Sequence, residues 1–216
     1  MIETESTLRY KLASFRPRKS WVRRWARRAA VAAVFVDRKP SGDDPGGVSL
    51  LFMKRATREG DPWSGDMSFP GGRTDPEDPN NFMTAVRELS EETGLDILAE
   101  GGEVISRLSD VQARGFRWGK RPFVVTPYLF WLDHEPENLQ IEPSEVETLV
   151  WIPLEFFMDP KNRGDMVWQR GNLSIPLPCY DYGRFRVWGL TLRMIDELTA
   201  FLGRNERAGG TAVEDV

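Results

Sequence analysis

The chain has 216 residues, of which 29% are charged and 40% hydrophobic, and its formal net charge at pH 7 is −4. Its length fits one domain with a substantial core, and its mild net charge gives no indication of a nucleic acid or a membrane as partner. One cysteine and one histidine exclude an internal disulfide, a thiolate zinc cluster and histidine-rich metal sites. We therefore expect any catalytic chemistry to depend on carboxylates and guanidinium groups.

Residues 1–28 form a basic extension, with nine Lys or Arg against Glu3 and Glu5. We expect this extension to be helical and to lead into a buried strand. The apolar run that follows, AAVAAVFV at 29–36, is too short for a membrane span, which needs about 20 residues. A lone cysteine fits a reducing compartment, so we expect a cytoplasmic protein. The alternative is a mitochondrial location with the Arg-rich start as a transit peptide.

Two short apolar runs, at 29–36 and 48–53, are separated by a sequence rich in Gly, Pro and Asp. This pattern predicts two strands of a hairpin with a long loop between them. The turn-rich stretch at 54–79 follows the second strand, and loops of this length are often functional.

A helix is predicted after this loop. Asn80 or Asn81 can cap its first turn, and Gly94 suits the left-handed residue just past its end. Its apolar stripe has the i, i+3, i+4, i+7 spacing of a buried helix face and consists of Phe82, Ala85, Val86 and Leu89.

The second half of the chain mixes strands and helices without regular alternation. We predict strands at 103–110 and 123–132, a strand with a short helical turn at 147–157, and a strand end followed by an amphipathic helix at 186–203. This order favours an α+β fold, with a mixed sheet between helices, over a doubly wound parallel sheet. We expect one domain at 29–202 and a flexible tail at 203–216.

Three glutamates crowd into little more than one turn of the predicted central helix. Glu88, Glu91 and Glu92 point within about 100° of one another, and like charges at this spacing repel. Two interpretations are open. The glutamates form either a solvated acidic face or a site for a hard divalent cation, which prefers several carboxylate or carbonyl oxygens.

The sequence around these glutamates, GGRTDPEDPNNFMTAVRELSEETGL at 71–95, resembles the Nudix box of the Nudix hydrolase family. The residues in register with the box are Gly72, Arg87, Glu88, Leu89, Glu91, Glu92, Gly94 and Leu95. Two departures, Asp78 in place of a glutamate and one extra residue between it and Arg87, resemble the coenzyme A pyrophosphatase-like branch. The upstream pattern of that branch is similar to Arg55, Ala56, Gly65, Phe69, Pro70, Gly71 and Gly72, although Asp61 lies near the position of its second arginine.

The resemblance implies a Nudix-type mixed sheet between helices and a site that uses Mg²⁺ or Mn²⁺. The implied metal ligands are Glu88, Glu91, Glu92 and the carbonyl of Gly72. The implied catalytic residues are Glu91, Glu92, Arg87 and Glu145, with Arg87 pairing with a neighbouring glutamate. The general base stays open between a box glutamate and a glutamate of a later loop, Glu145 or Glu147.

Substrate binding is expected from Arg55, Arg73, Phe69 and Gly71, and Lys54 is a further cation that could clamp phosphates. The basic loop at 112–122 fits either a nucleotide-binding lid or an ordinary exposed loop. The lid residues would be Arg114, Phe116, Arg117, Trp118, Lys120 and Arg121. Trp63 could stack on a base or anchor its own loop by packing.

The first functional hypothesis is a metal-dependent hydrolase that cleaves the diphosphate of coenzyme A or acyl-coenzyme A. ADP-ribose, NADH and dinucleoside polyphosphates are alternative substrates, and a nucleotide-sensing Nudix module without turnover is the alternative class. We expect a small nucleotide diphosphate as partner, no nucleic acid and no membrane, and a homodimer is possible.

Overall fold

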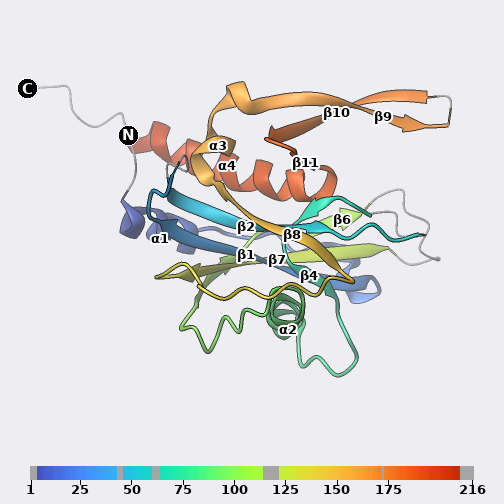
Figure 1. Cartoon of the computed structure of the whole chain (residues 1–216), viewed down its shortest axis with the longest axis horizontal. Helices are drawn as coiled ribbons and strands as arrows, with labels where there is room; N and C mark the ends of the chain where they lie inside the picture. The colour runs from blue at the N-terminus through green and yellow to red at the C-terminus, as the bar shows by residue number, and fades with distance from the viewer. Residues whose placement is uncertain (1–3, 43–45, 60–63, 114–121, 172, 210–216) are drawn as a thin grey trace, which may run out of the picture.

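A mixed β-sheet lies at the centre of the computed structural model, which describes residues 4–42, 46–59, 64–113, 122–171 and 173–209 (Figure 1). Its strands are β1 (Arg27–Arg38), β2 (Gly47–Arg55), β3 (Met67–Ser68), β4 (Gly71–Arg73), β5 (Glu103–Arg107), β6 (Val111–Ala113), β7 (Phe123–Leu132) and β8 (Val146–Pro153). β1 runs parallel to β7 and antiparallel to β2 and β4, so the sheet is mixed. The order is β3-β2-β1-β7-β5, with β8 paired to β2 and β6 paired to β7.

Helices cover both faces of this sheet (Figure 1). α2 (Asn81–Thr93) packs on one face, while α1 (Glu5–Ala13), α3 (Leu154–Met158) and α4 (Gly189–Gly209) pack on the other. Because side chains alternate along a strand, Ala33 and Phe35 of β1 join the core on the α4 side, and Val34 and Val36 join the core on the α2 side. The predicted α+β fold, with a mixed sheet between helices, is confirmed.

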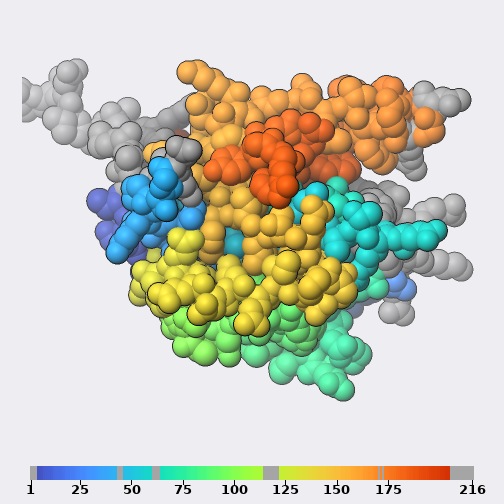
Figure 2. All heavy atoms as spheres, viewed as in Figure 1, coloured from blue at the N-terminus to red at the C-terminus, as the bar shows by residue number. Residues whose placement is uncertain are grey.

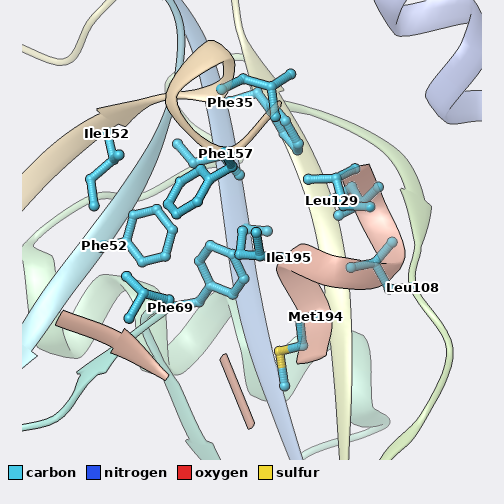
Figure 3. Close-up of a cluster of buried hydrophobic side chains, with 14 of the residues drawn as sticks. Phe35, Phe52, Phe69, Leu108, Leu129, Ile152, Phe157, Met194 and Ile195 are labelled. Atoms are coloured by element: carbon cyan, nitrogen blue, oxygen red, sulfur yellow. The ribbon is translucent and has the colours of Figure 1, made fainter. Parts of the chain in front are cut away.

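The larger core cluster lies between the sheet and α4. The rings of Phe52, Phe69 and Phe157 are at most 2% exposed, and Phe52 stacks on Phe69 with 4.7 Å between ring centroids. Figure 3 shows these rings near Ile195 of α4. Leu12 of α1 is fully buried in the same cluster. The N-terminal helix is therefore part of the main core.

The predicted hairpin and the predicted central helix are both confirmed. β1 and β2 pair antiparallel. The side chain of Asn80 accepts a hydrogen bond from the N–H of Met83 at 3.1 Å, and Gly94 ends α2 with a left-handed φ of 71°. These caps fix where α2 begins and ends, and they place its acidic residues beside β4.

Several elements differ from the expected ones. A second sheet consists of β9 (Arg163–Arg170), β10 (Leu173–Tyr182) and β11 (Phe185–Trp188); β11 corresponds to the strand end predicted at 186, whereas no element was predicted for β9 and β10. The β9–β10 hairpin stands out from the body of the molecule (Figure 2). The basic segment forms α1 and the short 3₁₀-helix η1 (Trp21–Arg24), and a second 3₁₀-helix, η2 (Pro160–Asn162), precedes β9. α4 continues to Gly209, beyond the expected start of the tail at 203.

Within the described ranges, we find no helix with the length and apolar character needed to cross a bilayer.

Candidate functional site

The last turn of α2 presents Glu92 to the turn between β3 and β4. Its side chain is 2% exposed, and its Oε2 accepts a hydrogen bond of 2.7 Å from the N–H of Gly71. Gly71 pairs with Val31 of β1, and its φ of 149° is in the region that favours glycine. A Cβ at Gly71 would overlap the carbonyl oxygen of Ala30. Gly71 therefore lets β4 approach β1 closely enough to anchor the buried carboxylate.

Glu88 lies one turn earlier on the same helix face and meets the next residue of β4. Its side chain is 14% exposed. A Cβ at Gly72 would overlap Oε2 of Glu88, so the missing side chain of Gly72 makes the space that this carboxylate fills. Two glutamates and two consecutive glycines thus form a small cluster of carboxylates packed against backbone, which we call the Gly71–Gly72 pocket.

Arg87 binds the carboxylates around this pocket together. Its Nε and Nη2 each donate to Asp78 at 3.0 Å, its Nη2 also donates to Glu88 at 2.9 Å, and its Nη1 donates to Glu91 at 2.8 Å. Nη2 also donates to the carbonyl oxygen of Arg73 at 3.2 Å. The expected pairing of Arg87 with a neighbouring glutamate is present. The guanidinium fixes the conformation of Glu88 and ties α2 to the end of β4.

Asp78 is the strongest partner of Arg87. Its side chain is 6% exposed and also accepts from the Thr84 hydroxyl at 2.9 Å and from the Asp75 N–H at 2.8 Å. The bidentate hydrogen bond from Arg87 holds the pKa of Asp78 well below its ordinary value. Sequence reasoning recorded Asp78 only as a departure from the box. Its role could have been found, since an acidic residue there is part of the box pattern.

Burial raises the pKa of both pocket glutamates. The pKa of Glu92 rises to about 8, mainly through burial and with a contribution from the negative charge of Glu88. The pKa of Glu88 is also raised, and burial is again the largest cause. The surrounding protein groups therefore stabilise the ionised form of these two carboxyl groups less well than water does. Hard carboxylate oxygens with uncompensated charge are the donor set that Mg²⁺ or Mn²⁺ binds, so these residues fit such an ion.

Glu91 lies apart from the other two box glutamates. Its side chain is 57% exposed and rests on Arg87. In the part of the chain that the structure describes, no three Asp, Glu, His or Cys side chains are close enough together to hold a metal ion. The structure thus brings Glu88, Glu92 and Gly72 together and leaves Glu91 outside the pocket.

The segment between β7 and β8 brings Glu145 toward the pocket. Its backbone caps the end of α2, with Gln140 N–H donating to Thr93 O at 2.8 Å and Glu142 N–H donating to Glu92 O at 3.3 Å. Figure 2 shows this segment, in yellow, across the front of α2, in green. The charge of Glu145 is a smaller cause of the raised pKa of both Glu88 and Glu92, after burial.

The two late-loop glutamates, Glu145 and Glu147, have different hydrogen-bond partners. Arg58, which sequence reasoning missed, donates from Nη2 to Glu145 at 3.1 Å, and its Nε donates to the carbonyl oxygen of Ser144. No spacing signal in the sequence indicates this pair. Glu147 instead accepts from Lys54 Nζ at 2.7 Å. Of the two alternatives for the late-loop base, Glu145 is therefore the one whose negative charge contributes to the raised pKa of Glu88 and Glu92.

The expected substrate-binding residues lie in different environments. Arg55, at the end of β2, is close enough to Glu92 for its positive charge to lower that carboxyl's pKa against the effect of burial. Arg73 is exposed at the end of β4. The prediction that Phe69 binds substrate is wrong. Its ring is 1% exposed and stacks on Phe52, so it anchors β3 and β4 in the core. The N–H of Gly71 is bonded to Glu92 rather than open to a ligand.

Asp61, Trp63 and the predicted lid residues lie outside the described residues. The lid residues concerned are Arg114, Phe116, Arg117, Trp118, Lys120 and Arg121.

Comparison with known proteins agrees with the box. A family model described as NUDIX domain matches residues 26–169. The human protein named mitochondrial coenzyme A diphosphatase NUDT8 is 34% identical over 166 residues, which cover 76% of this chain and 66% of that protein. Its mouse counterpart is 34% identical over 176 residues, covering 80% of this chain and 77% of that protein. The chain thus spans about two thirds of the human relative's length.

Among solved structures, the Nudix hydrolase RenU from M. smegmatis superposes with a TM-score of 0.51 at 16% identity, covering 89% of this chain and 92% of that one. This likeness concerns the fold. Together with the family match, it leads to one conclusion: the chain belongs to the Nudix hydrolase family.

Proposed function

We propose that this protein is a metal-dependent hydrolase that cleaves the diphosphate of coenzyme A or acyl-coenzyme A. The observation that carries the proposal is the Gly71–Gly72 pocket, where Glu88 and Glu92 are buried with raised pKa values and incompletely compensated charge. Two relatives at 34% identity are named coenzyme A diphosphatases, which supports this choice of substrate.

Glu88 and Glu92, with the Gly72 carbonyl, are the groups that hold Mg²⁺ or Mn²⁺ in this proposal. Glu91 is the third carboxylate ligand in this proposal, and it joins the others by leaving Arg87, which now donates to it at 2.8 Å. When bound, the cation neutralises charge on the diphosphate oxygens and lowers the pKa of a bound water. Arg87 acts as a positioning residue, because its guanidinium donates to Glu88 and is itself fixed by Asp78.

The chain's own residues supply the proton acceptor and the phosphate contacts. Glu145 accepts the proton of the attacking water, whose oxygen forms the new bond to phosphorus as the bridging P–O bond breaks and its electron pair leaves with the departing phosphate. Arg55 and Arg73 bind the phosphate oxygens. Cleavage of coenzyme A in this way yields a phosphopantetheine fragment and an adenosine bisphosphate.

A nucleotide-sensing module without turnover is the alternative from another class. Degenerate Nudix domains of that kind tend to lose box glutamates, whereas Glu88, Glu91 and Glu92 are all present here. This favours an enzyme.

A hydrolysis screen tests the proposal. The wild-type protein would be incubated with Mg²⁺ or Mn²⁺ and coenzyme A, ADP-ribose, NADH, a diadenosine polyphosphate or a nucleoside triphosphate, and the products identified by mass. We expect the highest kcat/KM for coenzyme A or an acyl-coenzyme A. Preferred cleavage of another compound would overturn the choice of substrate, and binding without cleavage would favour the sensor.

Two variants at exposed glutamates make the screen specific for the site. Glu91→Gln should lower kcat by orders of magnitude with the fold intact, because it removes a proposed ligand. Glu155→Gln, at an exposed glutamate of α3, should keep the wild-type rate. If the Glu91→Gln variant were as fast as the control, Glu91 would not be a ligand of the metal ion.

A further inference from the structure

The charge of the chain is unevenly distributed along the sequence. Residues 14–28 contain no Asp or Glu, whereas the whole chain has a net charge of −4. The cations of this segment are Arg16, Arg18, Lys19, Arg23, Arg24, Arg27 and Arg28. We call residues 16–28 the basic knuckle. The expectation of no membrane partner followed from the net charge, which conceals this local excess.

Two tryptophans are exposed in the basic knuckle. Trp21 is 76% exposed and Trp25 is 49% exposed, and their rings meet edge to face with 5.2 Å between centroids. Between them, Val22 of η1 is only 7% exposed, so the turn is anchored through Val22 while both indoles face solvent. Large exposed aromatic rings are uncommon on a soluble surface without a partner.

A buried carboxylate holds the knuckle in place. The side chain of Asp110 has no exposed surface, accepts from the Ser20 N–H at 2.8 Å, and pairs with Arg23 at 3.3 Å. The N–H of Arg27 donates to the Pro122 carbonyl at 2.8 Å. The exposed indoles are therefore presented by an ordered turn.

Most cations of the knuckle have no acidic partner among the residues that the structure describes. Arg18 is 89% exposed and is 4.0 Å from Glu197, and Arg23 is paired with Asp110. The remaining cations form no ion pair with any residue that the structure describes, and they are Arg16, Lys19, Arg24, Arg27 and Arg28. A segment with this composition carries a local excess of positive charge, which is complementary to a densely anionic partner.

We propose that the basic knuckle binds the surface of an anionic lipid bilayer. Indoles prefer the boundary between headgroups and acyl chains, because the ring is apolar and its N–H is polar. Nearby Arg and Lys side chains gain electrostatic attraction from anionic headgroups. A nucleic acid strand fits less well, because the rings of Trp21 and Trp25 are 75° apart and cannot stack on successive parallel bases.

Vesicle cosedimentation tests this inference independently of the hydrolase activity. The probes are vesicles of phosphatidylcholine alone and of phosphatidylcholine with phosphatidylserine in equal amounts, at low and high salt. We expect the full chain to sediment with the anionic vesicles only, and less at high salt. Neutralising Lys19 and Arg24 together, as Lys19→Gln with Arg24→Gln, should lower the partition coefficient about 25-fold, since each cation contributes a factor of about 5.

Two further variants test whether binding depends on the indoles of the knuckle or on any exposed aromatic ring. Trp21→Ser with Trp25→Ser should weaken sedimentation about tenfold or more, because it removes the apolar area that enters the interface. Tyr10→Ser, at a residue of α1 that is 78% exposed, is the matched control and should sediment like the wild type. All variants should retain the wild-type hydrolysis rate toward a soluble substrate.

The contrary results are equally definite. Absence of the wild type from the anionic vesicle pellet would overturn the inference, and so would equal sedimentation of the wild type and the knuckle variants. Tight binding to a labelled single-stranded RNA without binding to vesicles would assign the knuckle to nucleic acid instead.

Discussion

Glu92→Gln is the substitution that most directly probes the buried charge of the Gly71–Gly72 pocket. The glutamine keeps the size of the side chain and a carbonyl oxygen for the Gly71 N–H, which now donates to Glu92 at 2.7 Å. It removes the carboxyl group, and with it the proton equilibrium that burial shifts. The variant should therefore differ from the wild type mainly in how stability depends on pH.

The size of this effect follows from the pKa of Glu92, which burial raises from 4.5 to about 8. Between these values the folded protein keeps the proton that the unfolded chain has lost, so the free energy of unfolding falls as pH rises. At about 1.4 kcal/mol per pH unit, a shift of this size costs about 5 kcal/mol across the window. That is a large part of the 5–15 kcal/mol typical of a whole domain.

Urea denaturation in the presence of EDTA measures this dependence. The wild type should lose stability steeply between pH 5 and pH 8, and Glu92→Gln should be flatter across the same range and more stable at pH 8. Glu155→Gln should follow the wild type. Parallel curves for the wild type and Glu92→Gln would show instead that Glu92 ionises normally in the folded protein.

Three other substitutions have distinct expected outcomes. An alanine Cβ at position 72 would overlap the Glu88 carboxylate, so Gly72→Ala should displace it and lower kcat at least about tenfold in a steady-state assay. An unchanged rate would show that the contact between Gly72 and Glu88 is not needed for catalysis. Asp78→Asn should destabilise the protein by about 1–3 kcal/mol and lower kcat about 10–100-fold, because Arg87 loses its strongest partner; wild-type kinetics would contradict this. Leu12→Ala should cost about 2–5 kcal/mol in urea denaturation, since Leu12 is fully buried, and an unchanged midpoint would place α1 outside the core.

The central helix was predictable because its signals are local. Asn80 accepts from a backbone N–H of the first turn, and Gly94 adopts the left-handed conformation that ends the helix. Both signals act within four residues along the chain and need no tertiary contact. The hairpin of β1 and β2 was predictable for a similar reason, since its apolar runs and the breaker sequence between them are contiguous.

The site was only partly predictable because burial is a tertiary property. The helical wheel groups Glu88, Glu91 and Glu92 as one patch, but Glu92 is 2% exposed and Glu91 is 57% exposed. The difference arises because the Gly71 N–H binds Glu92 in the interior, whereas Glu91 binds Arg87 at the surface. Nothing in the spacing of the glutamates indicates which of them a distant glycine will bury.

Two further features could not be predicted from the sequence, each for a physical reason. Phe69 lies in a glycine-rich loop whose neighbours bind carboxylates, yet its ring is buried in the core, and a loop sequence does not reveal which residue turns inward. The pairing of β9 with β10 also gives little sequence signal. Pro176 and Pro178 occur within β10, and proline is normally a sign against a strand.

Manganese binding is the most direct test of the claim that the Gly71–Gly72 pocket is a cation site. Free Mn²⁺ would be measured by electron paramagnetic resonance during titration of the wild type, Glu92→Gln and the control Glu155→Gln. We expect the wild type and the control to bind with equal affinity, more tightly as pH rises because the carboxylates must lose their protons. Glu92→Gln should bind at least about tenfold more weakly. Equal affinity in all three proteins would show that Glu92 does not bind the cation.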